Sequence, residues 1–524
     1  MILAVIVAIP LAAALLCWLF AGASALWSRW ITLVAAIADL ALAAAVWAAH
    51  PAASLVGGPW IAAFAAPWIP QWGIDFRLAS DGLSLLMVLL TAVLSAVSVL
   101  VSWGPIKERV PFFHVSLNLV SAGILGVFLA EDLFLFYLFW ELMLIPMYFV
   151  IAVWGHENRR FAAIKFVIFT QVGALLMLLA ILALYFIHGE QTGRYTFDYF
   201  QLLGTPLSRS ASMVIMLGFF AAFAIKLPAF PFHTWLPDAH TQAPTAGSVI
   251  LAGLLLKTGA YGLIRFAVPL FPDAALRFAP IAMILGVAGI LYGAALAFAQ
   301  DDLKRLVAYT SISHLGFVLI GVFAWNTLAL QGTVIQMIAH GLSTGALFIL
   351  AGSLQDRLHT RDMRTMGGFW SSAPKMGGMA LFFALASLGL PGLANFIGEL
   401  LIFLGAFHSY PVYVILAAVG LILATVYSLM IIFRAFHGSP KENAKPPDLG
   451  ARELGVLSLL GALLVWIGLF PQAVLNTSAP AVNALQGMRT TAVTTAQGVP
   501  TVAGAPFASP SVVADLRSPR EELQ

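Results

Sequence analysis

Long apolar runs separated by short polar segments fill the chain from residue 1 to about residue 476. A helix needs about 20 consecutive, mostly apolar residues to cross the hydrocarbon core of a bilayer, and the runs have about that length. The pattern predicts an all-α polytopic membrane protein with about 14 transmembrane helices. The predicted spans are 1–20, 28–49, 80–102, 112–130, 133–153, 162–187, 211–233, 242–268, 279–299, 304–323, 327–354, 377–407, 411–435 and 453–475.

Three segments do not follow this pattern simply. Residues 51–82 are rich in Pro and Trp, and we predict an interfacial hairpin there because Trp favours the membrane surface. Residues 477–524 have no helical period, and we predict an extended or disordered tail. Residues 1–20 resemble a signal peptide because small residues follow them, but no positively charged segment precedes the apolar run. We expect them to remain as the first helix.

Composition and charge agree with a membrane protein. The chain is 61% hydrophobic and 9% charged, whereas soluble domains carry about 25% charged residues. The net charge of +3 gives no indication of nucleic-acid binding. Lys and Arg cluster in alternate loops, and because basic loops stay cytoplasmic, both termini are predicted to be periplasmic. The single cysteine, Cys17, excludes disulfides within the chain and cysteine-ligated clusters, so redox centres are expected on other chains.

A helix break is predicted just past Lys226, because Pro228 and Pro231 follow it. Broken backbone at membrane depth survives only where it is buried in protein or lines a water-filled cavity. An ionisable side chain inside a span indicates a functional site. Both signals coincide at Lys226.

A second predicted break lies at Pro391, in the segment that carries Glu399. Each break falls in the fourth helix of a five-helix unit, and two such consecutive units must be inverted in the membrane. Paired broken helices in inverted halves indicate a transport path. The predicted organisation is N-terminal helices and hairpin at 1–110, a first repeat at 111–270, an inverted repeat at 278–436, a last helix at 453–476 and a tail at 477–524.

Glu141 lies in the middle of the fifth predicted span, where a charge costs about 2.5–3.5 kcal/mol on insertion scales. Lys226 is the evident opposite charge. A pair of this kind has two states, because separating the charges favours loss of the lysine proton. The alternative is a purely structural ion pair, although a fixed pair does not need a broken helix.

Four further residues extend this series of ionisable groups. Lys257 lies in the middle of its span, His314 and His340 lie in later spans, and Glu399 follows the second break. Histidine suits a proton relay because its ordinary pKa is near neutrality. For the two histidines, simple helix packing is an equal alternative.

Other polar residues fit simpler roles. Lys165 could offer protons an access route or could extend its amine to the membrane surface. Asp301 and Asp302 lie near span ends, where solvated or capping groups are common. His233, Asp238 and His240 have a weak metal-site spacing, but they sit on a loop that contains two prolines, and we expect them to break and cap helices. No metal site or bound cofactor is predicted on this chain.

Five motifs resemble the antiporter-like subunits of respiratory complex I, the bacterial NADH–quinone oxidoreductase. They are residues 226–266, DGLSLLM at 81–87, WELMLIPMYF at 140–149, AYTSISHLGF at 308–317 and LPGLANFIGELL at 390–401. The resemblance covers nearly all predicted helices and fails only in the tail. An acid at Glu399, where related members carry lysine, favours the M-type members of the family.

The resemblance implies a proton-pumping subunit with fourteen helices in two inverted repeats. Its key residues correspond to Glu141, Lys226, Lys257 and Glu399. NADH, FMN, iron–sulfur clusters and quinone would belong to partner subunits, with antiporter-like subunits and lipids as neighbours in a bacterial inner membrane. The predicted function is therefore proton translocation through Glu141, Lys226, Lys257, His314, His340 and Glu399, driven by quinone reduction elsewhere.

Two rival functions remain. The chain could belong to a multisubunit cation/proton antiporter or a membrane-bound hydrogenase, which share these motifs. It could also be a scaffold whose ion pairs only hold helices together.

Overall fold

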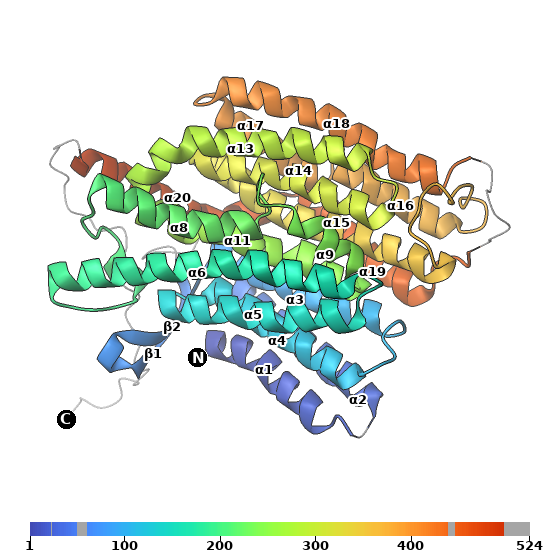
Figure 1. Cartoon of the computed structure of the whole chain (residues 1–524), viewed down its shortest axis with the longest axis horizontal. Coiled ribbons are helices and arrows are strands. Elements are labelled where there is room, and N and C mark those ends of the chain that lie inside the picture. Colours follow the sequence, from blue (N-terminus) through green and yellow to red (C-terminus); the bar gives the residue numbers. More distant parts are fainter. Residues whose placement is uncertain (23, 50–59, 439–445, 497–524) are drawn as a thin grey trace, which may run out of the picture.

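Long helices run side by side through the computed structural model, which describes residues 1–22, 24–49, 60–438 and 446–496 (Figure 1). In this part of the chain, thirteen helices are long and apolar enough to cross a membrane. They are α1 (Ile2–Leu19), α2 (Ala25–Ala49), α3 (Gly82–Ser102), α4 (Val110–Leu129), α5 (Leu133–Trp154), α6 (Arg159–Thr192), α8 (Arg209–Lys226), the composite segment Thr245–Leu270, α13 (Pro272–Phe298), α14 (Leu303–Ala324), α15 (Thr327–Leu358), α18 (Pro411–Ala435) and α19 (Ala451–Leu469).

The twelfth predicted span is divided into two shorter helices, and this accounts for the difference from fourteen. They are α16 (Pro374–Ser387) and α17 (Ala394–Phe407), each 14 residues long. Between them, Gly389 and Gly392 have φ values of +81° and +93°, which glycine adopts at little cost. Pro391 stands between these glycines and has no backbone N–H to continue a helix. The predicted break at Pro391 is confirmed.

The break after Lys226 is also confirmed. Helix α8 ends at Lys226, and a non-helical stretch leads to the short helix α9 (Trp235–Gln242). The next span is a composite of α10 (Thr245–Ile250), η3 (Leu251–Leu255), α11 (Leu256–Gly262), η4 (Leu263–Ala267) and α12 (Val268–Leu270). The segments η3 and η4 are π-helical, and π-helical turns are frequent at functional sites.

The predicted hairpin between the second and third spans is a β-hairpin in its described part. Strands β1 (Trp60–Ile69) and β2 (Ile74–Asp81) pair antiparallel around the 3-10 turn η2 (Pro70–Trp72). Residues 50–59 lie outside the described residues. The hairpin is the one exception to the all-α prediction among the described residues, and it lies at one end of the helices (Figure 1). Near it, the short helix α7 (Tyr199–Leu202) follows α6.

The prediction of an extended or disordered tail from residue 477 is wrong up to residue 496. Helix α20 (Gln472–Ala496) continues there and packs against α3 and α15. Val474, Ser478, Val482 and Leu485 are buried at helical spacing, so a weak helical period was present in the sequence. Residues 497–524 lie outside the described residues.

Several helix starts are capped by the carboxylates that precede them. Asp302 is the N-cap of α14 and accepts a hydrogen bond from the Arg305 backbone N–H. Asp132 caps α5 in the same way, through the N–H groups of Phe134 and Leu135. The predicted capping role of Asp302 is therefore confirmed.

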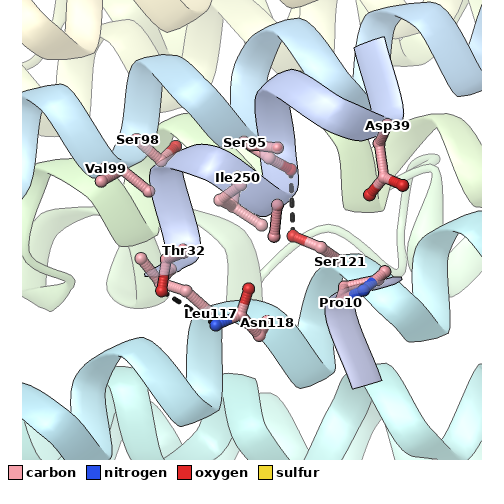
Figure 2. Close-up of a pocket in the computed structure, with 12 residues that line it drawn as sticks. Pro10, Thr32, Asp39, Ser95, Ser98, Val99, Leu117, Asn118, Ser121 and Ile250 are labelled. Carbon is pink, nitrogen blue, oxygen red and sulfur yellow. Dashed lines mark hydrogen bonds between the residues drawn. The ribbon is translucent and has the colours of Figure 1, made fainter. Parts of the chain in front are cut away.

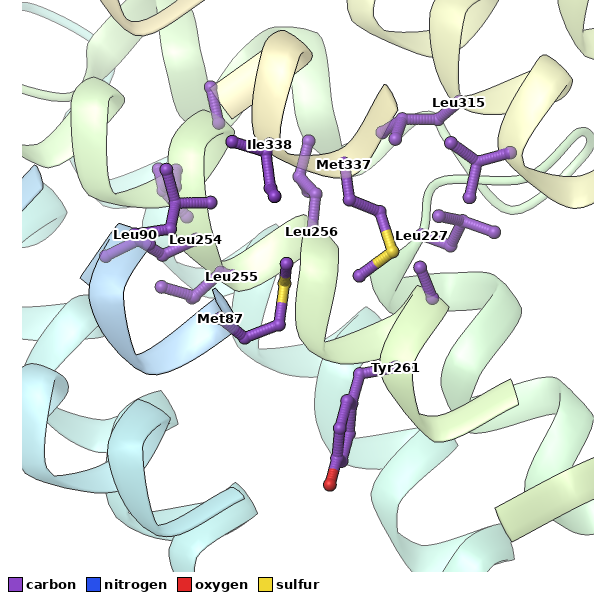
Figure 3. Close-up of a cluster of buried hydrophobic side chains, with 14 of the residues drawn as sticks. Met87, Leu90, Leu227, Leu254, Leu255, Leu256, Tyr261, Leu315, Met337 and Ile338 are labelled. Atoms are coloured by element: carbon purple, nitrogen blue, oxygen red, sulfur yellow. The ribbon is translucent and has the colours of Figure 1, made fainter. Parts of the chain in front are cut away.

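The composite segment Thr245–Leu270 and helix α15 form the centre of the molecule. Both are buried throughout their apolar stretches, whereas α1, α2, α6 and α18 keep an exposed face. Figure 3 shows Leu254, Leu255 and Leu256 lying among Met87 of α3 and Met337 of α15. This apolar packing surrounds the position of the next residue, Lys257, and excludes bulk water from it.

Candidate functional site

Lys226 ends α8 in an apolar and aromatic pocket. Its side chain is 1% exposed, and its Nζ has no hydrogen-bond partner among the described residues. The amine instead lies over two aromatic rings, 5.1 Å from the ring centroid of Trp140 and 5.6 Å from that of Phe166. Aromatic faces attract a cation, so these rings stabilise the charged amine without fixing it in a hydrogen bond.

Glu141 lies one residue beyond Trp140 on α5, in a partly exposed position. Its Oε1 accepts a hydrogen bond of 3.5 Å from Nε2 of Gln171, and Tyr137 also bonds to its carboxylate. Among the described residues, no ion pair within 4.0 Å joins Glu141 to Lys226. The two charges therefore make no direct contact in this structure, and their pairing stays a prediction. Lys226 instead contacts the ring of Trp140, the neighbour of Glu141 on α5, and the spacing along two different helices could not reveal this contact.

Lys257 and His340 are in direct contact. The Lys257 Nζ lies 2.7 Å from Nδ1 of His340 and also donates a hydrogen bond to the backbone oxygen of Ala252. Ala252 belongs to the π-helical segment η3, where the backbone turn is wider than in an α-helix. Both side chains are fully buried, and Nε2 of His340 has no hydrogen-bond partner among the described residues. A proton can be shared directly between these two groups.

His314 and Glu399 form the next contact. The His314 Nδ1 lies 3.1 Å from Oε1 of Glu399, and its Nε2 lies 3.1 Å from Oγ of Ser387. Nε2 of Gln336 donates a hydrogen bond of 3.0 Å to the same Glu399 oxygen. The Glu399 carboxylate therefore has partners on α14 and α15, and Ser387 at the end of α16 contacts the other nitrogen of the His314 ring. Glu399 is 3% exposed.

The two contacts are neighbours in the interior. The rings of His314 and His340 have centroids 5.8 Å apart. Four predicted relay residues therefore form a buried row of two pairs, Lys257 with His340 and His314 with Glu399. Lys226 packs against the helix that carries Lys257. A Cβ atom added at Gly259 would lie 3.2 Å from the Cβ of Lys226, so the two backbones are close at this point. Glu141 is not part of this row, since it is hydrogen-bonded to Gln171 of α6.

Lys165 lies apart from this row. Its Nζ forms an ion pair of 2.6 Å with Oδ2 of Asp238, and Arg305 lies 3.4 Å from the other oxygen of the same carboxylate. Asp238 is in the first turn of α9, where an acid is favourable at the positive end of the helix dipole. The predicted helix-start role of Asp238 agrees with this position. Among the described residues, no group of three or more His, Cys, Asp or Glu side chains could hold a metal ion.

Sequence reasoning gave no sign of a shared site for two buried groups, Lys304 and His240, and the half-buried His156. Lys304 is fully buried in the first turn of α14, with its Nζ 3.3 Å from the Ala243 oxygen and 3.4 Å from Nε2 of His156. Burial, together with the charges of Lys304 and Arg361, lowers the pKa of His156 to about 4. His240 is buried with neither ring nitrogen bonded to a described residue, and it stacks on Phe348 at 4.4 Å. All three residues lie at or near the ends of helical segments, where the sequence pattern indicates solvated or capping groups.

A cleft opens beside these groups. Its volume is about 1040 Å³, and its lining includes His156, Asp302, Gln355 and Arg361. Arg361 pairs with Asp302 at 2.9 Å. His156 lines this cleft and also contacts the buried Lys304 amine. A single residue therefore separates the amine from a charged, water-accessible surface.

A second unpredicted cluster lies near the β-hairpin. Arg265 is fully buried, forms an ion pair with Asp81 and lies 3.7 Å from Oε1 of Glu131. Burial raises the pKa of Glu131 to about 8, and the nearby Arg265 opposes this shift. Its carboxylate oxygens have no hydrogen bond from the described residues. Arg265, Asp81 and Glu131 therefore form a buried group of ionisable side chains near the end of the composite segment Thr245–Leu270.

Comparison with known proteins identifies the family. The family described as "NADH:quinone oxidoreductase/Mrp antiporter, TM" matches residues 130–425, which include every predicted relay residue. The chain belongs to this family. One relative of high identity is NADH-quinone oxidoreductase subunit M of Pseudomonas aeruginosa. It is 53% identical over 508 residues, and the match covers 95% of this chain and 100% of the relative. Subunit M of Escherichia coli K12 is 51% identical over 506 residues, covering 94% and 99%.

Solved structures of the family share the fold. A chain of respiratory complex I from Thermus thermophilus with bound NADH has a TM-score of 0.83 and 34% identity, covering 93% of this chain and 100% of that one. A chain of the Mrp complex from Dietzia sp. has a TM-score of 0.81, covering 95% and 99%, at 19% identity. The second likeness concerns the fold alone. The predicted family and fold class are confirmed: this family member is an antiporter-like membrane subunit.

Proposed function

We propose that this chain is the proton-translocating M-type subunit of a bacterial NADH–quinone oxidoreductase. The observation that carries the proposal is the buried row of two pairs, Lys257 with His340 and His314 with Glu399, whose histidine rings lie 5.8 Å apart. Subunit M relatives of more than 50% identity cover almost the whole chain. NADH, FMN, iron–sulfur clusters and quinone belong to partner subunits in this proposal, and quinone reduction there drives the protons here.

The proposed path begins at the cleft that contains His156. Protons pass by Lys304 and His240 to Lys257, where the apolar packing of Figure 3 keeps bulk water away. They then move through His340 and His314 to Glu399. Because the described contacts leave gaps between Lys304, His240 and Lys257, ordered water must complete this part of the path. Lys165, paired with Asp238, is a surface ion pair beside the path rather than its start.

The control element is Lys226 at the break of α8. Among the described residues, its amine contacts the rings of Trp140 and Phe166 without a hydrogen bond, so a movement of α5 that brings Glu141 to Lys226 breaks no hydrogen bond of the amine. A pair with Glu141 stabilises the charged lysine, and loss of the pair releases the proton. In this proposal the two broken helices occupy matching places in two inverted five-helix repeats, and both termini are periplasmic.

Glu141→Gln and Lys226→Ala test this function. Both variants should abolish the contribution of this subunit to NADH-driven proton pumping in inverted membrane vesicles, while NADH oxidation with an artificial acceptor continues. Thr91→Ala is a matched control, since Thr91 is buried on α3 and bonds only to its own helix backbone. Normal pumping in both charge variants would contradict the proposal. Loss of assembly with isosteric neutral replacements would favour the scaffold alternative.

The cation/proton antiporter remains the second candidate. The Mrp likeness at 19% identity shares the fold and does not favour that function over the first. Affinity purification from mildly solubilised membranes separates the two, because only the first candidate brings NADH-oxidising subunits with it.

A further inference from the structure

A polar column runs through the N-terminal helices, outside the relay. On α4, His114, Asn118 and Ser121 share one face at spacings of four and three residues. Nδ2 of Asn118 donates hydrogen bonds of 2.9 Å to Thr32 Oγ1 on α2 and to the His114 backbone oxygen. Polar contacts therefore connect α2 with α4 through an otherwise apolar helix group.

The column leads to a small cavity between α2, α3 and α4. Its volume is about 10 Å³, close to the space needed for one water molecule. Ser95 of α3 and Ser121 of α4 meet beside it with their hydroxyl oxygens 2.9 Å apart. Figure 2 shows the Asp39 carboxylate turned toward the part of the cavity that Ser121 and Pro10 line.

Asp39 has no evident counter-charge. It is 3% exposed, and its Oδ1 has no hydrogen-bond partner among the described residues. On the surrounding helices α1 to α4, the other ionisable side chains are Cys17, Arg29 and His114. All three lie toward the end where α1 stops and α2 begins, and no described cation lies within 4.0 Å of Asp39. An unpaired carboxylate in this environment is unfavourable, whereas a neutral carboxylic acid can donate a hydrogen bond to water.

We propose that Asp39 is a proton-binding site that holds one proton and one water molecule in this cavity. Asn118 and Thr32, which line the same cavity, supply the proton from the membrane face where α1 ends and α2 begins, the predicted cytoplasmic face. The site goes beyond the proposed relay, because the described lining of the cavity includes none of the relay residues.

Infrared spectroscopy of the purified complex tests the site. At pH 7, subtracting the spectrum of the Asp39→Asn complex from that of the unchanged complex should leave a carboxylic acid C=O band that shifts in D₂O. The amide cannot give this band. Absence of the band means that Asp39 is ionised or holds a cation such as Na⁺, and it would overturn the proposal. Ser121→Ala keeps Asp39 and should shift the same band, so the site stays testable even if Asp39→Asn does not assemble.

The rate of hydrogen–deuterium exchange of this band tests the column. Asn118→Leu should slow the exchange about tenfold, the scale of one lost hydrogen bond. Thr91→Ala on α3 is the matched control, because its hydroxyl donates to the Met87 oxygen at 2.8 Å and should leave the rate unchanged. Equal rates in the Asn118→Leu and unchanged complexes would overturn the assigned path.

Discussion

At the scale of residues, the site depends on a lysine amine whose partners are few and specific. Lys257 bonds to the Ala252 oxygen and to His340, both in the buried interior. A lysine in such a position can exist with or without its extra proton, because burial opposes the charge while the carbonyl oxygen favours it. The histidine next to it offers a nitrogen that can accept a proton.

The Lys257→Arg variant distinguishes two roles for this residue, a fixed positive charge and a group that releases a proton. A guanidinium keeps its proton at all ordinary pH values, so the variant retains a cation but cannot pass a proton to His340. We expect pumping by this subunit to fall at least about a hundredfold, the lower end of what proton-transfer groups contribute. Proton uptake by vesicles, measured beside electron transfer to an artificial acceptor, checks this. Full pumping with arginine would show that Lys257 acts only as a fixed charge.

Glu131 gives a pH-dependent prediction for stability. Burial raises its pKa from 4.5 to about 8, so the folded chain binds more protons than the unfolded chain between these values. The contribution of Glu131 to stability is therefore greatest below about pH 4.5 and falls as the pH rises toward 8, by at most about 1.4 kcal/mol per pH unit. Glu131→Gln cannot ionise and should flatten this dependence. Thermal inactivation of the complex at pH 5, 6, 7 and 8 measures it, and parallel curves for both proteins would contradict it.

At the scale of elements, the two helix breaks position the site, and both were predictable because proline and glycine act locally. The contacts between elements were not. Lys257 and His340 are 83 residues apart, and their contact depends on how Thr245–Leu270 packs against α15. The sequence indicated that Glu141 and Lys226 pair because both are isolated charges, but it could not show that the Lys226 amine lies over the Trp140 ring.

The start of α14 shows a second limit of sequence reading. Lys304 follows Asp301 and Asp302 at a helix start, where a basic residue normally faces solvent. Its burial depends on the packing of α9 against α14, which brings the Ala243 oxygen to its amine. Helix α20 was missed for another reason: Pro480 and many Thr and Ser residues masked a weak helical period that tertiary packing completes.

Two glycines at the second break allow a matched test. A Cβ added at Gly389 would lie 3.1 Å from Oε2 of Glu399, whereas one at Gly392 meets only Leu469 Cδ2 at 3.9 Å. Both replacements by alanine carry the strain of a positive φ, about 1 kcal/mol or more. Gly389→Ala should lower pumping more than Gly392→Ala at similar amounts of assembled complex. Quantitative immunoblots and vesicle pumping measure both, and equal pumping would show that Glu399 tolerates displacement.

At the scale of the whole molecule, α20 connects the central helix α15 with α3 and α2. It contacts α3 and α15, and Trp47 of α2 donates a hydrogen bond of 2.9 Å to Thr477. The backbone of α20 comes very close to Gly82 at the start of α3. This close approach leaves no space for a side chain.

Gly82→Ala should therefore displace α20. The added Cβ would fall 1.6 Å from the Thr477 oxygen, so backbone must move, and we expect a loss of about 1–3 kcal/mol of stability. Gly455→Ala in α19 is the control, since no atom outside its own helix turn lies within 4 Å and alanine favours a helix by about 1 kcal/mol. Thermal aggregation of the detergent-purified complex compares the two. Equal midpoints would mean that α20 does not stabilise the fold.

The central claim is that Lys257, His340, His314 and Glu399 act in series on one proton path. The most direct measurement is the number of protons pumped per electron by reconstituted complexes with Lys257→Arg, Glu399→Gln and both changes together. For one path in series, each single variant and the double variant lose the same number of protons per electron, because any break stops the same flow. A double variant that loses more than either single variant, or single variants with the unchanged ratio, would contradict the claim.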